Sequence, residues 1–311
     1  MGVFLRWLPA AMLLLSGSGA WAQPYAVLRM ETSARLSALG GASTALPMGD
    51  LGAAWYNPAL LPEGQAPEFG LGYGRVLGTV ETFWLGLRRS LSTRGALGGH
   101  ILLVHYGSFE RLSESGEEEG RFAAGEVVFA LQYRYTWPGG IRSGIALRTL
   151  YSLLDQYRAL VLVLDAGLVW PLGQGWTAAL VARHLGRAVQ TYTATNEQPA
   201  PEVIVSVSKR LAYLPFTAHL AFSTPSEMPE RFSVLGRQLA LGGEFALSPA
   251  FLLRVGYRVR EQAELRQRNR LDAAGLRFGF GLQVRRFGLD YTYRSFSTPG
   301  GAHLWSLRLL L

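Results

Sequence analysis

Long stretches of this chain alternate between apolar and polar residues. Between residues 251 and 260 every odd position is apolar, whereas most even positions hold arginine or glycine. Similar runs cover 127–137 and 276–285. A period of two predicts a β-strand with one apolar face. Each run is about ten residues long, which matches the ~9–11 residues of a tilted strand that crosses a bilayer and exceeds the ~5–6 residues of a globular strand.

The arginines in these runs indicate which face of each strand points away from lipid. An arginine on the lipid-facing side at the middle of a bilayer costs about 2–4 kcal/mol, whereas an arginine in a wet lumen costs little. The arginine-bearing face is therefore predicted to line the inside of a barrel. The residues predicted to face the lumen are Arg134, Arg148, Arg254, Arg258, Arg277 and Arg294.

Marking every run of this kind predicts about fourteen strands, and an even number is typical of single-chain bacterial barrels. The predicted strands lie at 66–76, 80–91, 95–107, 124–137, 140–153, 157–170, 174–186, 201–210, 214–223, 237–247, 250–262, 272–284, 286–297 and 302–311. The transmembrane β-barrel would thus occupy residues 66–311.

The connections between these strands sort by length. With a periplasmic N-terminus, the periplasmic turns would be the tight ones at 92–94, 138–139, 171–173, 211–213, 248–249 and 285–286. The connections toward the cell exterior would include the long segments 108–123, 187–200, 224–236 and 263–271. Outer-membrane barrels have short periplasmic turns and longer external loops, whereas a soluble sandwich has no reason to sort its loops in this way. The sequence therefore predicts an all-β transmembrane protein, an antiparallel outer-membrane barrel.

The first 22 residues are typical of a secretory signal peptide. Arg6 lies near the start, residues 8–15 form a short apolar core, and residues 20–22 are Ala-Trp-Ala, which suits a cleavage site. The alternative is a membrane anchor, but the apolar run is shorter than the ~20 residues that a spanning helix needs. We expect the mature chain to begin at Gln23 and to be an integral protein of the outer membrane of a Gram-negative bacterium.

Residues 23–65 do not alternate and precede the first predicted strand. A second short element is expected to begin at Asn57 and Pro58, because asparagine suits the N-cap and proline the first helical position. A barrel of fourteen strands is wide enough to need filling if it is not to leak. We therefore predict that residues 23–65 form a plug inside the lumen, the alternative being a periplasmic tail.

The composition and the spacing of the histidines argue against most kinds of catalytic, metal-binding and nucleic-acid-binding site. The absence of cysteine removes disulfides, thiolate metal sites, cysteine nucleophiles and a lipid-anchored cysteine. The net charge is +8, but the arginines are scattered along the chain, so we expect no nucleic-acid partner. His100 and His105 share a predicted strand, yet their odd spacing places them on opposite faces. With no catalytic motif present, we predict that the protein is not an enzyme and holds no cofactor or metal.

Several stretches carry a resemblance to a known family. They are Ser33-Ala34-Arg35, Gly40-Gly41, Asp50, Asn57-Pro58-Ala59, Tyr106 to Phe122, Tyr151 to Leu154, and a C-terminal run from Gly256 to Tyr291. Together they resemble the PorV/PorQ group of FadL-like outer-membrane barrels, and within that group the PorQ proteins of the type IX secretion system. The final Leu311 departs from the aromatic residue with which outer-membrane barrels usually end.

The resemblance implies a non-enzymatic part in protein export. Proteins of this kind belong to a surface attachment complex with PorU, PorV and PorZ. That complex handles cargo with a C-terminal signal domain and fixes it to lipopolysaccharide. The expected partners are therefore outer-membrane lipid, lipopolysaccharide and these three proteins, with PorZ held at the surface. The alternative is a FadL-like transporter of hydrophobic small molecules, which the lumenal arginines disfavour without excluding.

A docking function needs a contact surface, and the external loop 108–123 is the candidate. It combines aromatic and charged side chains, which interface centres favour. The candidate residues are Phe109, Glu110, Arg111, Arg121 and Phe122. The alternative is a solvated loop whose aromatic side chains pack on the barrel rim, with the acidic run 117–119 simply hydrated.

Overall fold

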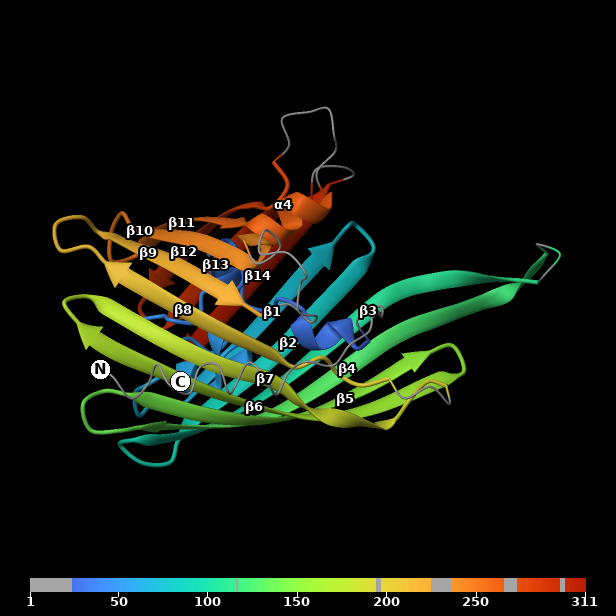
Figure 1. Cartoon of the computed structure of the whole chain (residues 1–311), viewed down its shortest axis with the longest axis horizontal. Coiled ribbons are helices and arrows are strands. Elements are labelled where there is room, and N and C mark those ends of the chain that lie inside the picture. The colour runs from blue at the N-terminus through green and yellow to red at the C-terminus, as the bar shows by residue number, and fades with distance from the viewer. Residues whose placement is uncertain are drawn as a thin grey trace.

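The computed structural model describes residues 24–113, 115, 117–193, 197–224, 236–265, 273–296 and 300–311. Across these ranges the chain closes into a single antiparallel barrel of fourteen strands (Figure 1). The predicted signal peptide, 1–22, lies outside the described residues, as do 114, 116, 194–196, 225–235 and 266–271 of the predicted external loops. None of the helices in the described part of the chain is long and apolar enough to cross a bilayer.

Each strand pairs with its neighbours in the sequence, and β1 pairs with β14 to close the barrel. The strands are β1 (Glu68–Val76), β2 (Val80–Ser90), β3 (Gly95–Leu112), β4 (Glu118–Thr136), β5 (Arg142–Leu154), β6 (Tyr157–Gly173), β7 (Trp176–Gln190), β8 (Glu202–Arg210), β9 (Phe216–Ser223), β10 (Leu239–Ala246), β11 (Phe251–Arg258), β12 (Leu276–Val284), β13 (Phe287–Ser295) and β14 (Gly301–Leu310). The predicted fold class and strand number are confirmed. We call the end of the barrel where β1 begins and β14 ends the inner end, and the opposite end the outer end.

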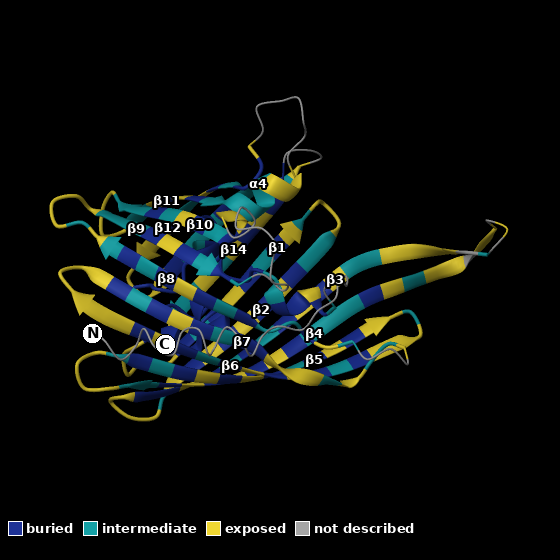
Figure 2. Ribbon diagram, in the orientation of Figure 1, coloured by how far each residue is buried: buried dark blue, intermediate teal, exposed yellow. Residues whose placement is uncertain are grey.

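Burial alternates along the strands as the sequence pattern predicts. On β2, Thr82 and Trp84 are buried, whereas Phe83, Leu85 and Leu87 are exposed. Figure 2 shows the same alternation of buried and exposed bands around the wall. The exposed apolar side chains form the surface that lipid covers, so the barrel wall supplies one apolar face to the membrane and its other face to the lumen.

Several predicted boundaries are wrong. β6 continues through the predicted turn 171–173, β7 continues through 187–190 of a predicted external loop, and two further errors are larger. Segment 108–123, predicted as a loop, is mostly strand: β3 and β4 stay paired as far as Leu112 and Glu118, with a register shift at Gly107. Gly107 has a φ of +94°, a conformation that glycine adopts without strain. The period of two breaks at this bulge, which is why the pattern ended there.

The second error concerns 259–262, which was predicted as strand. The chain instead turns after β11 into the helix α4 (Val259–Leu265). Alternation ends at this point, and the helix gains an Arg260–Glu264 ion pair of 2.7 Å at the spacing that favours helices. A further short helical turn, η5 (Gly236–Gln238), precedes β10.

Residues 24–62 lie inside the barrel except for the exposed positions 47–48, and 63–67 are exposed before β1 begins. They form η2 (Ala26–Arg29), α2 (Ala34–Ala38), η3 (Ala53–Trp55) and η4 (Pro58–Leu60), joined by irregular chain. Helix α2 packs against β11–β14, and η4 packs against β4–β6 on the other side of the lumen. Most apolar side chains of this N-terminal segment are fully buried, so the core of the molecule is the packing between the segment and the wall.

Candidate functional site

Polar side chains of the wall hold the backbone of the N-terminal segment. Because the segment has little regular structure, its buried carbonyls need partners elsewhere. The wall donates to them at Leu46 (from Arg142, 2.9 Å), Ala45 (Ser208, 2.6 Å), Ala54 (Gln132, 2.8 Å) and Ser37 (Arg277, 2.9 Å), and also at Trp55 from Arg148. His100 Nε2 lies 2.7 Å from the Leu51 carbonyl. The segment is thus bonded to the wall on opposite sides of the lumen.

The motif residues of the segment build its turns. Ser33 caps α2 by accepting the N–H of Leu36 at 3.2 Å, and Asp50 accepts the N–H of Ala53 at 2.7 Å. Asn57 accepts the N–H of Ala59 at 2.9 Å. Pro58 follows as the first helical residue, as the sequence predicted.

Three further motif positions, Ala34, Gly40 and Gly41, fix how the segment approaches the wall. Ala34 receives a bond from Thr292 at its carbonyl and donates its N–H to Ser306 at 3.0 Å. Gly40 and Gly41 have φ values of +91° and +74°, and a β-carbon on Gly41 would collide with the Glu31 carboxylate. Glycine is therefore required where the chain passes this carboxylate.

An ion-pair cluster lies toward the inner end, and Arg35 of α2 stands in it. Its guanidinium contacts Glu244 at 3.0 Å and Asp50 at 3.5 Å. Arg254 contacts the same Glu244 at 2.7 Å and Asp290 at 2.6 Å. This inner cluster contains one more carboxylate than guanidinium, and it ties the segment to β10, β11 and β13.

A second cluster lies nearer the outer end and centres on Glu31. The Glu31 carboxylate contacts Arg277 at 2.9 Å, Arg258 at 3.2 Å and Arg294 at 3.4 Å. Burial alone would raise the pKa of Glu31, but the three guanidiniums hold that pKa at about 2. Arg277 and Arg294 also contact Glu261 of α4, at 2.6 and 2.7 Å. The outer cluster therefore links the N-terminal segment to the helix at the outer end.

The remaining predicted lumenal arginines also face inward. Arg134 is buried beside Pro62, whose carbonyl it approaches at 3.5 Å, and lies 3.7 Å from Glu63. Arg148 pairs with Asp165 at 2.7 Å. Sequence reasoning found the face on which these arginines lie, but it missed their partners in the N-terminal segment.

One side of the lumen is apolar and is filled by the protein's own side chains. The buried wall residues there are Leu102, Val104, Val128, Leu150, Val161 and Val163. Tyr25, Val27 and Leu28 of the N-terminal segment pack against them, and Tyr192 stacks on Tyr25 with ring centres 5.9 Å apart. Tyr25 and Tyr192 carry no sequence signal of this position, because both lie outside the alternating runs.

A cavity of about 340 Å³ remains at the outer end, between the N-terminal segment and the wall. We call it the outer cavity. The arginines that line it include Arg29, Arg183, Arg258 and Arg294. The carboxylates include Glu31, Glu202 and Glu261. The cavity is therefore charged, in contrast to the filled apolar side of the lumen.

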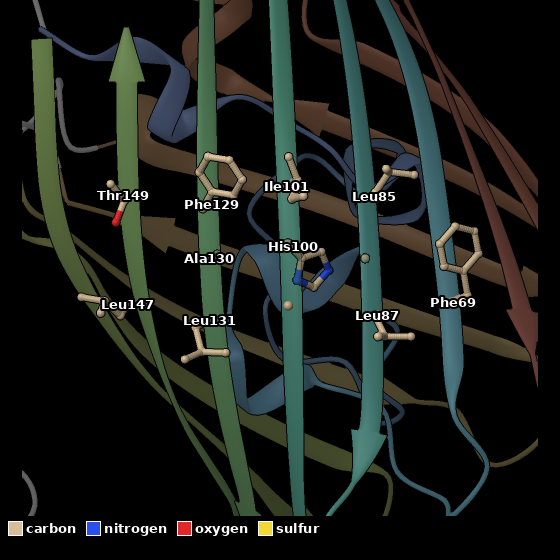
Figure 3. Close-up of a pocket in the computed structure, with 12 residues that line it drawn as sticks. Phe69, Leu85, Leu87, His100, Ile101, Phe129, Ala130, Leu131, Leu147 and Thr149 are labelled. Carbon is tan, nitrogen blue, oxygen red and sulfur yellow. The ribbon is translucent and has the colours of Figure 1, made fainter.

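The outward-facing surface of the barrel wall has a depression of about 430 Å³ over β1–β5. Figure 3 shows its apolar rim, which includes Leu85, Ile101, Phe129 and Leu131, with His100 behind the strands. His100 is occupied by its bond to the N-terminal segment on the lumenal side, and apart from Thr149 the other labelled side chains of the depression are apolar. We assign it to the lipid-covered surface.

The candidate docking residues lie on a two-stranded ribbon. Phe109 and Phe122 stack with ring centres 5.5 Å apart, and Arg111 lies 6.0 Å from the Phe122 ring centre while pairing with Asp155. Glu110 and Arg121 sit opposite each other across the two strands. The structure thus brings all five predicted residues together, and Phe109 is 42% exposed.

The comparisons with known proteins concern the fold. No family model matches the sequence, and no curated protein does either. The toluene transporter TodX of Pseudomonas putida is similar in structure, with a TM-score of 0.58 and 11% identity over 90% of this chain and 96% of TodX. The monoaromatic hydrocarbon channel CymD is similar at a TM-score of 0.58 and 12% identity, over 93% of this chain and 99% of CymD.

A FadL homologue of Pseudomonas aeruginosa matches at a TM-score of 0.49 and 11% identity, over 89% of this chain and 97% of the homologue. The assignment of the fold rests on TodX and CymD. The chain shares the barrel fold of TodX and CymD. Its closed barrel of fourteen strands with an apolar outward face is the architecture of an integral outer-membrane protein. TodX is described as a transporter and CymD as a channel.

Proposed function

We propose that this barrel is a non-enzymatic docking component of protein export at the cell surface, of the PorQ kind in the type IX secretion system. The observation that carries the proposal is the ribbon formed by the outer ends of β3 and β4 (Figure 1). Pairing of β3 with β2 stops at His105, and pairing of β4 with β5 stops at Ala124, whereas β3 and β4 continue together to Leu112 and Glu118. Among the described residues, neither long edge of the ribbon pairs with another strand, so both edges can bind a partner.

The state of the lumen supports docking over conduction. Wall side chains bond the N-terminal segment at many carbonyls, and two ion-pair clusters fix it further. The apolar side of the lumen is filled, and the outer cavity is charged. A segment held in this way acts as a plug, and the barrel then serves as a membrane-anchored frame for its outer surface.

Affinity purification from native outer membrane in mild detergent tests the export function. We expect PorU, PorV and PorZ to accompany the tagged protein. Recovery of the barrel without any of the three, under conditions in which they are present in the membrane, would contradict the proposal.

A substitution in the ribbon tests the docking surface. Replacing Phe109 and Arg111 together by alanine should release a PorZ-like partner from the cell surface while leaving the barrel assembled, because the pair lies beyond the transmembrane wall. The matched control is replacement of Phe287 and Arg286 by alanine, which removes the same residue types from the inner end. Retention of the partner at wild-type levels by the ribbon variant would exclude the ribbon as the docking site.

Transport of hydrophobic small molecules is the second candidate, and it is the one that the similar solved structures favour. TodX is a toluene transporter and CymD is a monoaromatic hydrocarbon channel. The apolar side of the lumen would form the path if Tyr25 and Tyr192 moved out of it. Uptake of radiolabelled toluene by cells that express the protein tests this function. Uptake above that of cells lacking it, with no co-purifying export proteins, would establish transport in place of docking.

A further inference from the structure

The inner end of the barrel carries a ring of positive charge. In the described chain six turns join the strands at this end, at 91–94, 137–141, 174–175, 211–215, 247–250 and 285–286, and none of them contains an aspartate or a glutamate. The exposed and half-buried cations in these turns and at the adjoining strand ends are Arg89, Arg94, Lys209, Arg210, Arg285 and Arg286. We call these six residues the basic rim.

Few negative groups offset the basic rim. Glu63 precedes β1 at the same end and lies 3.7 Å from the buried Arg134. A free carboxylate at Leu311 would add one more negative charge. In the described part of the chain none of the six rim cations forms an ion pair. Counting Glu63, that carboxylate and the extra carboxylate of the inner cluster against the rim still leaves an excess of three positive charges.

Aromatic side chains fix the depth of the rim in the membrane. Those on the outward face of the wall at the inner end are 43–58% exposed and include Trp137, Trp170, Trp176 and Phe287. Belts of this kind lie at the level of the lipid headgroups. Lys209 stands opposite Trp176 in the pairing of β7 with β8, and its ammonium lies 4.8 Å from the centre of that ring. The rim therefore lies at the depth of the headgroups that surround the barrel.

Arg89 shows that the rim is turned toward lipid. Burial alternates along β2, where Leu85 and Leu87 are exposed on the outward face and Arg88 is buried on the lumenal face. Arg89 continues the outward phase, is exposed, and stands opposite Leu97 of β3. A guanidinium on the outward face is costly in hydrocarbon, whereas anionic headgroups attract it.

We propose that the basic rim binds the headgroups of anionic phospholipids in the leaflet around the inner end. The rim cations lie at the β2–β3, β8–β9 and β12–β13 turns, which are separated around the barrel, and lipid reaches all of them at one depth. Lys209 donates to the Gln174 carbonyl at 2.7 Å, which leaves the other N–H donors of its ammonium for a phosphate. The inference does not depend on whether the barrel docks a partner or conducts a solute.

Quenching of tryptophan fluorescence by brominated lipids tests the proposal. The purified protein is reconstituted into phosphatidylcholine vesicles, and brominated phosphatidylglycerol or brominated phosphatidylcholine of the same chain length replaces a rising share of the lipid. Trp137, Trp170 and Trp176 report on the lipid beside the rim. We expect phosphatidylglycerol to be preferred at least about fivefold at low salt. The preference should vanish in about 1 M NaCl, where the Debye length is about 3 Å.

A triple variant removes half of the rim. Arg89→Gln/Arg94→Gln/Lys209→Gln should lose most of the preference for phosphatidylglycerol, because these side chains supply half of the rim charge. Heat-modifiability on gels verifies that the variant is folded. Lys209→Gln alone changes a single side chain at a strand end, and it should lower the preference measurably if the triple variant does not fold.

The matched control removes the same charge from the opposite end. Arg75→Gln/Arg158→Gln/Arg187→Gln replaces three exposed arginines at the outer end and should keep the preference. Equal quenching by the two lipids in the wild type overturns the proposal and leaves an acidic soluble protein as the partner of the rim. A preference that persists in high salt or in the folded rim variant also overturns it, as does an equal loss in the control.

Discussion

Arg148 and Asp165 form an ion pair inside the lumen that water does not reach. Both side chains are 0% exposed, and Arg148 Nη2 lies 2.7 Å from Asp165 Oδ2. Arg148 also donates to the carbonyl of Trp55, and its guanidinium lies 4.3 Å from the centre of the Trp55 ring. Replacing Arg148 by methionine would keep much of the packing volume and leave the Asp165 carboxylate buried without its countercharge.

The expected cost follows from that unpaired charge. Removing one partner of a buried ion pair destabilises a protein by about 3–5 kcal/mol. A second substitution, Asp165→Asn, should recover most of this loss, because asparagine is neutral and can still accept the N–H of His184, now 2.7 Å from Asp165 Oδ1. The control is Arg111→Met, whose pair with Asp155 is 46% and 26% exposed and should contribute less than about 1 kcal/mol.

Equilibrium unfolding in guanidinium chloride from detergent micelles, followed by tryptophan fluorescence, measures all three variants. We expect Arg148→Met to show the largest loss in free energy of unfolding, and the double variant to fall near the wild type. The reasoning is refuted if Arg148→Met lies within about 1 kcal/mol of the wild type. It is also refuted if the double variant is as unstable as the single one, since the lost contacts to Trp55 would then explain the effect.

Three further predictions concern the N-terminal segment and the orientation of the wall. Deleting residues 31–61 should open a steady current in planar bilayers, and a large current from the intact chain would show that the segment does not close the pore. The folded-state pKa of Glu31, about 2, lies below its ordinary value of 4.5, so its stabilisation is complete above pH 4.5 and is lost as the pH falls toward 2. Glu31→Gln should flatten the stability profile in that window, and an unchanged profile would contradict the ion-pair assignment. Arg258→Leu should destabilise less than Arg148→Met, because Glu31 keeps two other arginines, and Tyr257→Leu on the lipid-facing side should be milder still. Heat-modifiability on gels ranks these variants, and the opposite order for positions 257 and 258 would reverse the assignment of inside and outside.

The strands could be predicted because their signal is local. Alternation along β11 places Leu253 and Val255 on the outside and Arg254 on the inside within a few residues, so no distant contact is needed to recognise it. The signal fails where the period breaks. Gly107 introduces a bulge that hides the continuation of β3, and α4 follows β11 without a proline or glycine to mark the change.

The partners inside the lumen could not be predicted, because they depend on contacts between distant residues. Arg258 was predicted only to face the lumen, and in the structure it meets Glu31 of the N-terminal segment. Asp50 instead contacts Arg35, which lies 15 residues earlier in the chain. Arg35 also contacts Glu244 of the wall, which lies 209 residues later. Alternation assigns a side chain to the inside of a barrel, but it does not say which residue of the N-terminal segment that side chain reaches.

The bonds of Ala34 have a consequence for assembly. Its N–H binds Ser306, 272 residues later in the chain, and its carbonyl binds Thr292. The N-terminal segment is synthesised first, yet its binding surface is complete only when the last strand has joined the first. Closing so long a loop is slow, so docking of the segment is expected to be a late step of folding. The segment can thus reach its final position only in a finished barrel, which couples closure of the pore to completion of the wall.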